Sequence, residues 1–346
     1  MSKKLIKPKK LNRGDKVAVV SLSSGIAGDE ETIWRYYVGK ERLERIFGLK
    51  VVEMPHTLSG DDYIYNHPKK RAEDLMKAFS DKSIKAIFTC LGGVESIRML
   101  PYIDYDIIKN NPKIFLGYSD TTTTNFICYK AGVSSFYGAS VLSDFAENVQ
   151  VPQYTIDQIN DVLFCNEAIG EILPPDEWIC GHLDWNEDNK YTQREYTEND
   201  EYELLQGNGV VKGRLIGGCL EVLDMLNGTE IFPNNEDFNR AILFLETSDD
   251  HPTPVTVECF LRNFAARGIL ARLSGILFGK PSDEIFYDEY KEVIYKVLNE
   301  YNLGALPVLY NLSFGHTEPK MCLPYGAMAE INCEEVTFNI LESGVK

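Results

Sequence analysis

The chain has 346 residues, of which 44% are hydrophobic and 25% are charged, and it therefore has the composition of an ordinary globular protein with one large core or two medium ones. Its formal net charge of −17 disfavours binding to the phosphate backbone of nucleic acids or to an anionic membrane surface. No apolar stretch of the sequence approaches the roughly 20 residues that a membrane-spanning helix needs.

The first residues and the cysteines both indicate a cytoplasmic protein. A lysine-rich segment at residues 3–10 is followed by Asp15 and not by a long apolar run, so it does not have the form of a secretory signal. The eight cysteines are scattered singly, without a Cys-x-x-Cys pair, and they suggest neither zinc nor a disulfide framework. Reduced thiols are typical of the cytoplasm.

Residues 1–165 alternate short apolar strands with amphipathic segments, which is the pattern of a parallel α/β sheet. In chain order, the expected elements are a strand at 16–21, a helix at 30–46, a strand at 50–53, a helix at 71–79, a strand at 86–90, a helix at 95–100 and a strand at 113–117. A sheet of this kind places its functional side chains at the carboxyl ends of the strands.

The pattern weakens after residue 146, and residues 184–203 form a polar, acidic stretch. We expect residues 166–209 to be a linker with a tryptophan-bearing insert, which is either functional or disordered. Residues 210–346 are expected to form a second domain. Its expected elements are strands at 241–245 and 275–279, a helix at 254–268 and a β-like closing segment at 329–341.

The strand that ends at Gly117 leads directly into Ser119, and a run of threonines that begins a helix follows Asp120. This order resembles the nucleophile elbow of serine hydrolases, although the second glycine of Gly-x-Ser-x-Gly is missing. The alternative is that Ser119 or Asp120 caps the helix. Gly92 and Gly93 follow the preceding strand, so the backbone amides of Gly93 and Asp120 are candidates for an oxyanion hole. A plain strand-to-helix turn is the other interpretation.

A nucleophilic serine also needs a base and a carboxylate that orients it. His316 follows a mainly apolar run at residues 308–312. The other histidines lie in loop-like contexts: His56, His67, His182 and His251. Glu246 follows the apolar strand 241–245, although a turn or helix-cap role explains a lone carboxylate equally well. Ser119, Glu246 and His316 share a position at or beyond a strand end, in the chain order of the α/β-hydrolases.

Several segments resemble, in the right order, the landmarks of a serine peptidase family that includes the LD-carboxypeptidases and the microcin C resistance peptidases. These segments are Leu91-Gly92-Gly93, Leu100-Pro101-Tyr102-Ile103-Asp104-Tyr105, Gly117-Tyr118-Ser119-Asp120, Leu243-Phe244-Leu245-Glu246-Thr247-Ser248 and Phe314-Gly315-His316-Thr317. The resemblance implies a triad of Ser119, His316 and Glu246 that needs no metal or cofactor. It also implies a parallel-sheet α/β N-terminal domain, a smaller β-rich C-terminal domain and a homodimer, with the site between the domains.

The Leu-Pro-Tyr-Ile-Asp-Tyr run and the tryptophans Trp178 and Trp185 are more similar to the microcin-resistance branch than to the murein-recycling branch. That branch cleaves the amide between an aminoacyl or peptidyl group and a nucleotide analogue, and aromatic side chains stack on its adenine. A packing lid or a dimer contact is the alternative role for the tryptophans. Gly92 and Cys219 are further candidates for substrate contact. Cys219 stands where the family often has Asn, and Glu95 also departs from the usual pattern, which leaves the substrate open.

Two other functions remain open. The first is a murein tetrapeptide LD-carboxypeptidase that acts in cell-wall recycling. The second, from another class, is a catalytically silent ligand-binding module on the same scaffold, because a fold does not determine a function. A serine-directed fluorophosphonate would label Ser119 in an enzyme but not in a silent module.

Overall fold

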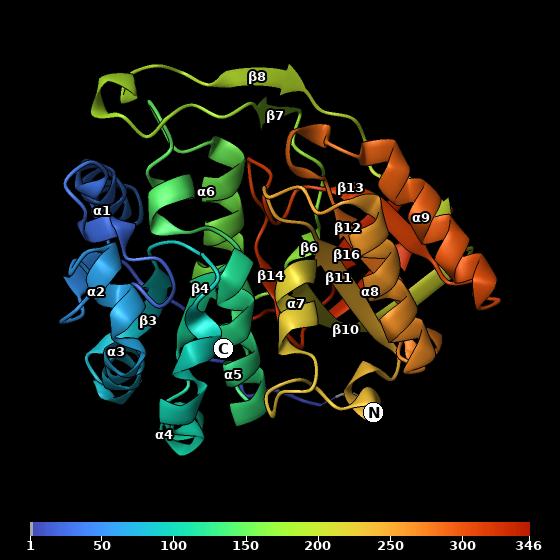
Figure 1. The fold of residues 1–346 in the computed structure, drawn as a ribbon, viewed down its shortest axis with the longest axis horizontal. Coiled ribbons are helices and arrows are strands. Elements are labelled where there is room, and N and C mark those ends of the chain that lie inside the picture. The colour runs from blue at the N-terminus through green and yellow to red at the C-terminus, as the bar shows by residue number, and fades with distance from the viewer. Residues whose placement is uncertain (1–2) are drawn as a thin grey trace.

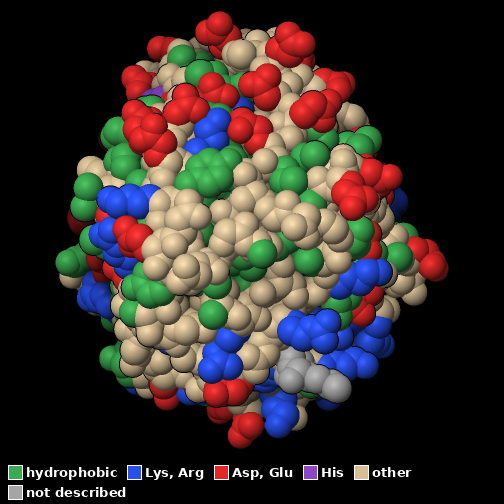
Figure 2. Space-filling view, turned by 90° about the vertical axis from the view of Figure 1, so that its right-hand side faces the viewer, with side chains coloured by type: hydrophobic (Ala, Val, Ile, Leu, Met, Phe, Trp, Pro, Cys, Tyr) green, Lys and Arg blue, Asp and Glu red, His purple; other side chains and the backbone are tan. Residues whose placement is uncertain are grey.

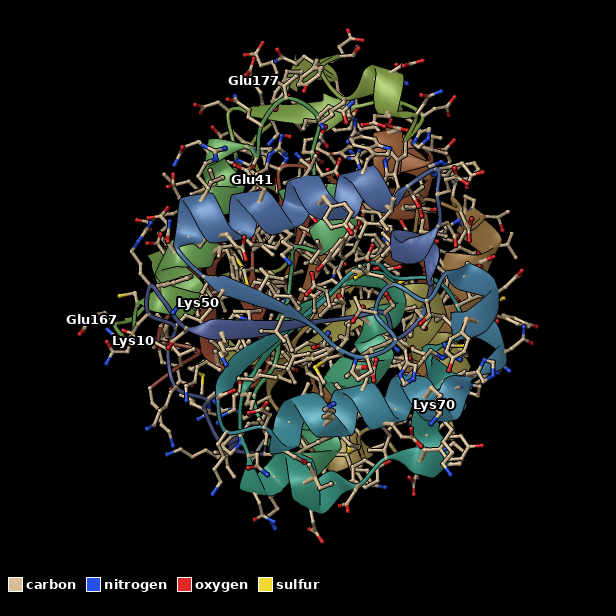
Figure 3. The ribbon with its side chains drawn as sticks, turned by 90° about the vertical axis from the view of Figure 1, so that its left-hand side faces the viewer. Lys10, Glu41, Lys50, Lys70, Glu167 and Glu177 are labelled. Atoms are coloured by element: carbon tan, nitrogen blue, oxygen red, sulfur yellow. The ribbon has the colours of Figure 1, made fainter. Side chains whose placement is uncertain are left out.

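The first strand, β1 (Lys16–Val20), is buried on both of its faces beyond Lys16, as expected at the centre of a parallel sheet. Because side chains alternate along a strand, its residues contribute to two different cores, one shared with α1 (Ile33–Phe47) and the other with α3 (Pro68–Ser80). Figure 3 shows these two helices on opposite sides of the strands. The computed structural model, which describes residues 3–346, therefore begins with a sheet covered on both faces.

Five parallel strands and one antiparallel edge strand form the N-terminal sheet, in the order β14-β5-β4-β3-β1-β2. The other strands are β2 (Lys50–Glu53), β3 (Ile84–Thr89), β4 (Ile114–Gly117), β5 (Phe136–Tyr137) and β14 (Leu323–Pro324). The other helices are α2 (Asp61–Asn66), α4 (Tyr105–Asn110), α5 (Thr122–Ala131) and α6 (Gln153–Ile159). The predicted parallel α/β architecture is confirmed.

The second sheet has a parallel centre, β10-β11-β12-β13, within the order β6-β16-β15-β10-β11-β12-β13-β9. Its strands are β6 (Gly170–Glu171), β9 (Glu203–Gln206), β10 (Val210–Cys219), β11 (Ala241–Glu246), β12 (Gly275–Gly279), β13 (Val308–Leu312), β15 (Met328–Asn332) and β16 (Thr337–Ile340). The helices are α7 (Leu220–Leu226), α8 (Pro254–Ala266) and α9 (Tyr287–Glu300). The sheet-rich C-terminal part is thus confirmed. Among residues 3–346, no helix is long and apolar enough to cross a bilayer.

The linker and insert, residues 166–209, are structured. Two of their strands, β6 and β9, join the C-terminal sheet, and the other two, β7 (Glu177–Cys180) and β8 (Glu195–Glu198), pair with each other as a hairpin. Figure 1 shows this hairpin lying across the top of both units, that is, of the N-terminal sheet and the second sheet with their helices. The view in Figure 2 keeps the same vertical axis, and its acidic side chains gather at this end. The hairpin therefore covers the ends of both sheets.

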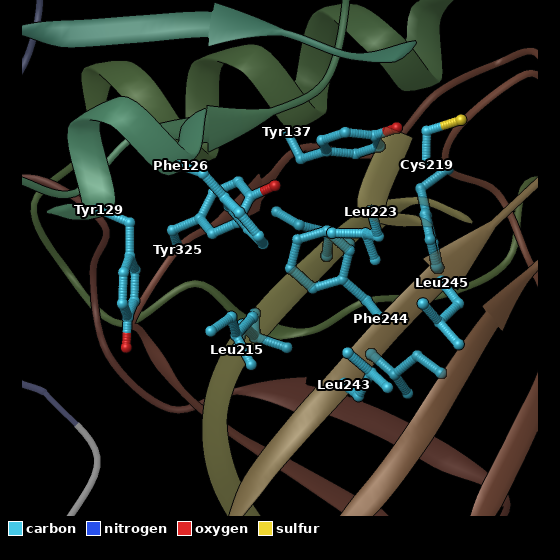
Figure 4. Close-up of a cluster of buried hydrophobic side chains, with 14 of the residues drawn as sticks. Phe126, Tyr129, Tyr137, Leu215, Cys219, Leu223, Leu243, Phe244, Leu245 and Tyr325 are labelled. Atoms are coloured by element: carbon cyan, nitrogen blue, oxygen red, sulfur yellow. The ribbon is translucent and has the colours of Figure 1, made fainter. Parts of the chain in front are cut away.

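A shared core fixes the two units against each other (Figure 4). The ring of Phe244, on β11, lies 5.5 Å from that of Tyr137 and 5.2 Å from that of Tyr325. Phe126, on α5, lies 6.2 Å from Tyr325, and all of these side chains belong to one buried cluster. Close-packed interiors of this kind leave little room for relative movement. Groups at the end of β4 and at the end of β11 are therefore held at a fixed separation.

Candidate functional site

Ser119 lies at a sharp turn between β4 and α5. Its φ is +63°, in the left-handed region, and one turn of 3₁₀ helix from Ser119 to Thr121 leads into α5. A residue other than glycine in such a conformation costs about 1–3 kcal/mol, and such strain is often found at functional sites. The Ser119 hydroxyl bonds to His316, and the Asp120 carboxylate bonds to Ser23 and to the backbone of Ser96. Neither side chain caps the helix.

The structure brings the three predicted residues Ser119, His316 and Glu246 together from three strand ends. The Nε2 atom of His316 lies 3.1 Å from the Ser119 Oγ, and its Nδ1 atom lies 2.8 Å from Oε2 of Glu246. Glu246 is the last residue of β11, and His316 lies four residues beyond the end of β13. With the imidazole proton on Nδ1, His316 donates to Glu246 and accepts from the serine hydroxyl.

Glu246 is fully buried, and both of its carboxylate oxygens are hydrogen-bonded. Oε1 accepts a bond from the hydroxyl of Tyr137, and Oε2 accepts from both the ring and the backbone of His316. Burial raises the pKa of Tyr137 well above its ordinary value, so its hydroxyl stays protonated and remains a donor. The same hydroxyl accepts a bond, 3.1 Å long, from the backbone N–H of Ser119. Tyr137, which sequence reasoning missed, therefore links the carboxylate to the elbow.

The charges of His316 and Glu246 shift each other's pKa in opposite directions. Burial lowers the pKa of His316, but the negative charge of Glu246 and the hydrogen bond to it outweigh burial and raise this pKa above 6.5. Burial raises the pKa of Glu246, but the attraction of the imidazolium outweighs it and keeps this pKa below its ordinary value. The site therefore stabilises a protonated His316 beside an ionised Glu246.

Gly92 and Gly93, in the loop after β3, leave no room for side chains. A Cβ atom on Gly92 would lie 2.6 Å from the Cβ of Ser119, and one on Gly93 would lie 2.6 Å from the Oγ of Ser23. The φ of Gly93 is +141°, which also favours glycine. The prediction that this loop lies beside the serine is confirmed, because β3 and β4 are parallel neighbours.

The Asp120 side chain ties this glycine loop to the elbow. It is fully buried, and its Oδ2 accepts a bond from the Ser23 hydroxyl and a 2.8 Å bond from the backbone N–H of Ser96. The Ser96 hydroxyl in turn donates to the Asp120 carbonyl over 2.9 Å. The predicted oxyanion role concerns the amide of Asp120, whereas the carboxylate holds the surrounding loops in position.

A cavity of about 760 Å³ opens at Ser119 between the two sheets and the hairpin. All the predicted substrate-contact residues line it: Gly92, Trp178, Trp185 and Cys219. Trp178 is 4% exposed, and the Nζ of Lys280 lies 4.5 Å from its ring centre. Trp185 is only half-buried, with the guanidinium of Arg35 at 4.5 Å. The second tryptophan is therefore the better placed to offer a ring face to a ligand.

Partly buried ion pairs join the hairpin to the loop that carries His316. Arg194, just before β8, donates to Glu147 over 2.9 Å and to Glu318 over 2.5 Å. The backbone N–H of Ile179, on β7, also donates to the carbonyl of Glu318 over 2.7 Å. Because Glu318 follows His316 by two residues, the hairpin directly contacts the segment that positions the imidazole. The sequence carried no signal for these pairs, since Arg194 lies 47 and 124 residues from its partners.

Comparisons with known proteins identify the family of the chain. Residues 17–138 match the LD-carboxypeptidase N-terminal domain of peptidase family S66, and residues 212–331 match the LD-carboxypeptidase C-terminal domain. The chain is 31% identical to the microcin C7 self-immunity protein MccF of Escherichia coli, over 89% of this chain and 88% of that protein. It is 27% identical to a probable murein peptide carboxypeptidase of Bacillus subtilis, over 98% of this chain and 95% of that one.

Solved structures show the same fold. An MccF-like protein from Streptococcus pneumoniae in complex with AMP has a TM-score of 0.86 and 35% identity, over 94% of this chain and 98% of that one. The microcin C7 self-immunity protein MccF in complex with aspartyl sulfamoyl adenosine has a TM-score of 0.86 and 28% identity, over 99% of this chain and 100% of that one. The chain belongs to the LD-carboxypeptidase family, peptidase family S66, and is a serine-type hydrolase.

Proposed function

We propose that the protein hydrolyses the amide that joins an aminoacyl or peptidyl group to a nucleotide analogue, and that Ser119, His316 and Glu246 form its catalytic triad. The observation that carries this proposal is the unbroken chain of hydrogen bonds from the Ser119 Oγ through His316 to Glu246, at the wall of a cavity large enough for a nucleotide conjugate. The protein would thereby detoxify antibiotics of the microcin C type.

In the proposed reaction, His316 Nε2 takes the proton of Ser119 as Oγ attacks the amide carbonyl. Glu246 holds the imidazole in the required tautomer and stabilises the imidazolium that forms. The backbone amides of Gly93 and Asp120 are proposed to donate to the developing oxyanion. The imidazolium then gives its proton to the leaving nitrogen, the C–N bond breaks, and a water molecule, activated by His316, hydrolyses the acyl-enzyme.

The nucleotide part of the substrate is proposed to lie under the hairpin. Trp185 lines the cavity and is only half-buried, so its ring can stack on a purine. The related structures named above hold AMP and aspartyl sulfamoyl adenosine, which supports a nucleotide-bearing ligand. Trp178, which is almost completely covered, is proposed to support the cavity wall, and Gly92 and Cys219 to lie against the acyl part.

Replacement of the nucleophile tests the proposal. Ser119→Ala should lower the rate of hydrolysis of an aminoacyl-sulfamoyl adenosine by at least about 10³-fold, while thermal stability stays near that of the wild type. Product release is measured by chromatography, and folding by circular dichroism. Hydrolysis by the Ser119→Ala variant at the wild-type rate would contradict the triad, and labelling of wild-type Ser119 by a fluorophosphonate would support it.

A murein tetrapeptide LD-carboxypeptidase is the second candidate, favoured by the identity to the Bacillus subtilis protein over nearly the whole chain. The same triad would cleave the L,D peptide bond of a murein tetrapeptide. Purified protein should be given a murein tetrapeptide and an aminoacyl-sulfamoyl adenosine in parallel assays. A higher kcat/KM for the nucleotide conjugate supports the first function, and a higher value for the tetrapeptide supports the second.

We also propose that the protein is a cytoplasmic homodimer. The cysteines of the described residues are all free, which suits a reducing compartment. The dimer follows from the family resemblance. Light scattering coupled to size-exclusion chromatography measures the molar mass, and a value near 39.2 kDa would contradict the dimer because that is the mass of one chain.

A further inference from the structure

One wall of the cavity at Ser119 is strongly acidic. Glu221, at the start of α7, and Asp249 and Asp250, in the loop after β11, all line the cavity. Ser248 connects Glu221 to the backbone of Asp250, because its hydroxyl and N–H donate to Oε1 of Glu221 over 2.5 and 3.0 Å, while its Oγ accepts a bond from the N–H of Asp250. The Glu221 carboxylate is therefore linked to the loop that carries Asp249 and Asp250, and all three residues line the cavity.

No lysine or arginine balances these charges within residues 3–346. Asp249 has an ionic contact only with His316, and neither Glu221 nor Asp250 has one. Both arginines that line the cavity, by contrast, are engaged with other groups. Arg35 donates to Asn148 and to the Leu142 carbonyl, and Arg194 pairs with two glutamates. Among the described residues that line the cavity, Glu221, Asp249 and Asp250 thus form a group of neighbouring carboxylates without a lysine or arginine partner, and Asp283 is a further one.

This wall lies beside the reacting atoms. An Oδ1 atom of Asp249 is 3.7 Å from the Nε2 of His316, and that nitrogen is 3.1 Å from the Ser119 Oγ. The thiol of Cys219 lies 3.5 Å from Oε2 of Glu221. Burial, with the charges of Glu246 and Glu221, raises the pKa of Cys219, so its thiol stays neutral and adds no further negative charge. Because Asp249 lies this close to His316, the side chain of an acyl residue whose carbonyl Ser119 attacks would lie within reach of these carboxylates.

Resting on the proposed acyl transfer at Ser119, we propose that the acyl residue of the substrate has a cationic side chain, an amine or a guanidine, which binds against Glu221, Asp249 and Asp250. The carboxylates are one wall of the hydrolytic cavity and not a separate site. An α-ammonium group alone supplies one positive charge against three carboxylates, whereas a lysyl residue supplies a second. An aspartyl residue would bring like charges together, which opposes binding. The net charge of −17 also attracts a cationic ligand from solution.

Three conjugates test the inference: lysyl-, methionyl- and aspartyl-sulfamoyl adenosine, which share the leaving group and differ in the charge of the acyl side chain. At low salt, the kcat/KM for the lysyl compound should be at least about fivefold higher than the kcat/KM for the methionyl compound. The difference between the lysyl and the aspartyl compound should be larger still. High salt should reduce these ratios, because ionic strength screens partly exposed charges. The inference would be overturned if the kcat/KM for the lysyl compound did not exceed that for the methionyl compound, or if the aspartyl compound had the highest kcat/KM.

Charge-neutral variants locate the effect. Glu221→Gln and Asp250→Asn should each reduce the ratio of lysyl to methionyl kcat/KM, because the amide side chains keep the shape but lose the charge. Asp250→Lys should raise the kcat/KM for the aspartyl compound relative to the kcat/KM for the lysyl compound. Asp224→Asn, an exposed site on the same helix as Glu221 and outside the cavity, is the matched control. Asp249 is left unchanged, since its loss would also change the pKa of His316.

Binding separates this inference from the proposed function. If the wild type hydrolyses none of the conjugates, the proposed function fails, but calorimetry with Ser119→Ala still compares their dissociation constants. Tighter binding of the lysyl than of the methionyl and aspartyl conjugates, reduced by Asp250→Asn, supports a cation-selective cavity. Equal binding of all three, or no binding of any, overturns it.

Discussion

The serine at the centre of the site is strained and tightly enclosed. Its left-handed φ is maintained because the N–H of Ser119 bonds to Tyr137, while Gly92 leaves space for the side chain on the other side. Glu246 is bonded on both oxygens and so cannot rotate without the loss of a buried hydrogen bond. At this scale, small displacements of single atoms decide whether Ser119 and His316 remain within hydrogen-bond distance.

Gly92→Ala should therefore impair catalysis more than folding. The added methyl would lie 2.6 Å from the Ser119 Cβ and 2.7 Å from its Oγ, so the serine must move away from its position beside His316. A displacement of this kind lowers kcat/KM by about 10²-fold, while the overpacking lowers the free energy of unfolding by about 1–3 kcal/mol. Gly304→Ala is the control, because the nearest atom to its Cβ lies 3.7 Å away. If a folded Gly92→Ala variant had the kcat/KM of the wild type, the conclusion that Gly92 is needed to keep Ser119 in its position beside His316 would be contradicted.

Glu246→Gln should shift the pH profile of the enzyme. His316 must be neutral to accept the serine proton, and its pKa is raised, so wild-type kcat/KM should rise with pH through a midpoint above 6.5. The amide removes the negative charge but leaves burial, which lowers the pKa of His316, so the midpoint should move to lower pH. The plateau should fall by about 10³- to 10⁴-fold, as when a triad carboxylate is lost.

The pH experiment has a direct control. Glu41→Gln, on the exposed surface of α1, should leave both midpoint and plateau in place, since its side chain is 58% exposed. NMR titration of the His316 ring checks the pKa without any substrate. An unchanged midpoint in Glu246→Gln would mean that another group sets the profile.

At the scale of elements, the hairpin and the loop after β13 are held together by hydrogen bonds and ion pairs. Glu318 contacts the hairpin through its backbone, which bonds to Ile179, and through its side chain, which bonds to Arg194. Burial raises the pKa of Glu318, but the positive charge of Arg194 outweighs it and lowers this pKa below its ordinary value. The carboxylate is consequently ionised and needs its cationic partner.

Arg194→Met should weaken the contact between the hairpin and the loop after β13. The substitution leaves Glu147 and Glu318 close together and without the guanidinium, and breaking these partly buried pairs should lower the free energy of unfolding by up to about 3 kcal/mol. The kcat/KM should fall too, since Glu318 lies two residues from His316. Thermal denaturation and steady-state kinetics measure the two effects.

A second substitution distinguishes repulsion from lost packing. Adding Glu318→Gln to Arg194→Met removes one of the two facing charges, so it should restore part of the stability. Arg45→Met is the control, because its ion pair with Glu41 is exposed and should contribute little. No loss of stability in Arg194→Met would show that the buried pairs do not hold the hairpin.

The sequence predicted the strands that deliver Ser119 and Glu246, because continuous apolar runs that end in polar residues carry a strong local signal. It did not predict the role of Tyr137. That residue belongs to a strand of only two residues, which is too short for any periodicity, and its hydroxyl acts through a contact 109 residues away in the chain. The antiparallel edge strand β14 was missed for the same reason, since its pairing with β5 is purely tertiary.

At the scale of the whole molecule, the site exists only because two sheets are held together. Ser119 comes from the N-terminal sheet, while Glu246 and His316 come from the C-terminal one. The aromatic cluster in Figure 4 draws its side chains from both units and includes Tyr137, whose hydroxyl donates a hydrogen bond to Glu246. Strand β14 further links them, because it follows the second sheet's β13 in the chain but pairs with β5 of the first.

Because the two sheets share one buried cluster, the chain should unfold in a single cooperative transition, and Phe244→Ala should shift that transition as a whole. The ring of Phe244 is fully buried between Tyr137 and Tyr325, and its removal should lower the free energy of unfolding by about 3–5 kcal/mol. Tyr191→Ala is the control, because its side chain is 82% exposed and should have little effect. Differential scanning calorimetry reads both results. Two separate transitions, only one of which moves in Phe244→Ala, would show that the sheets fold independently and that the separation between Ser119 and His316 is not fixed by this core.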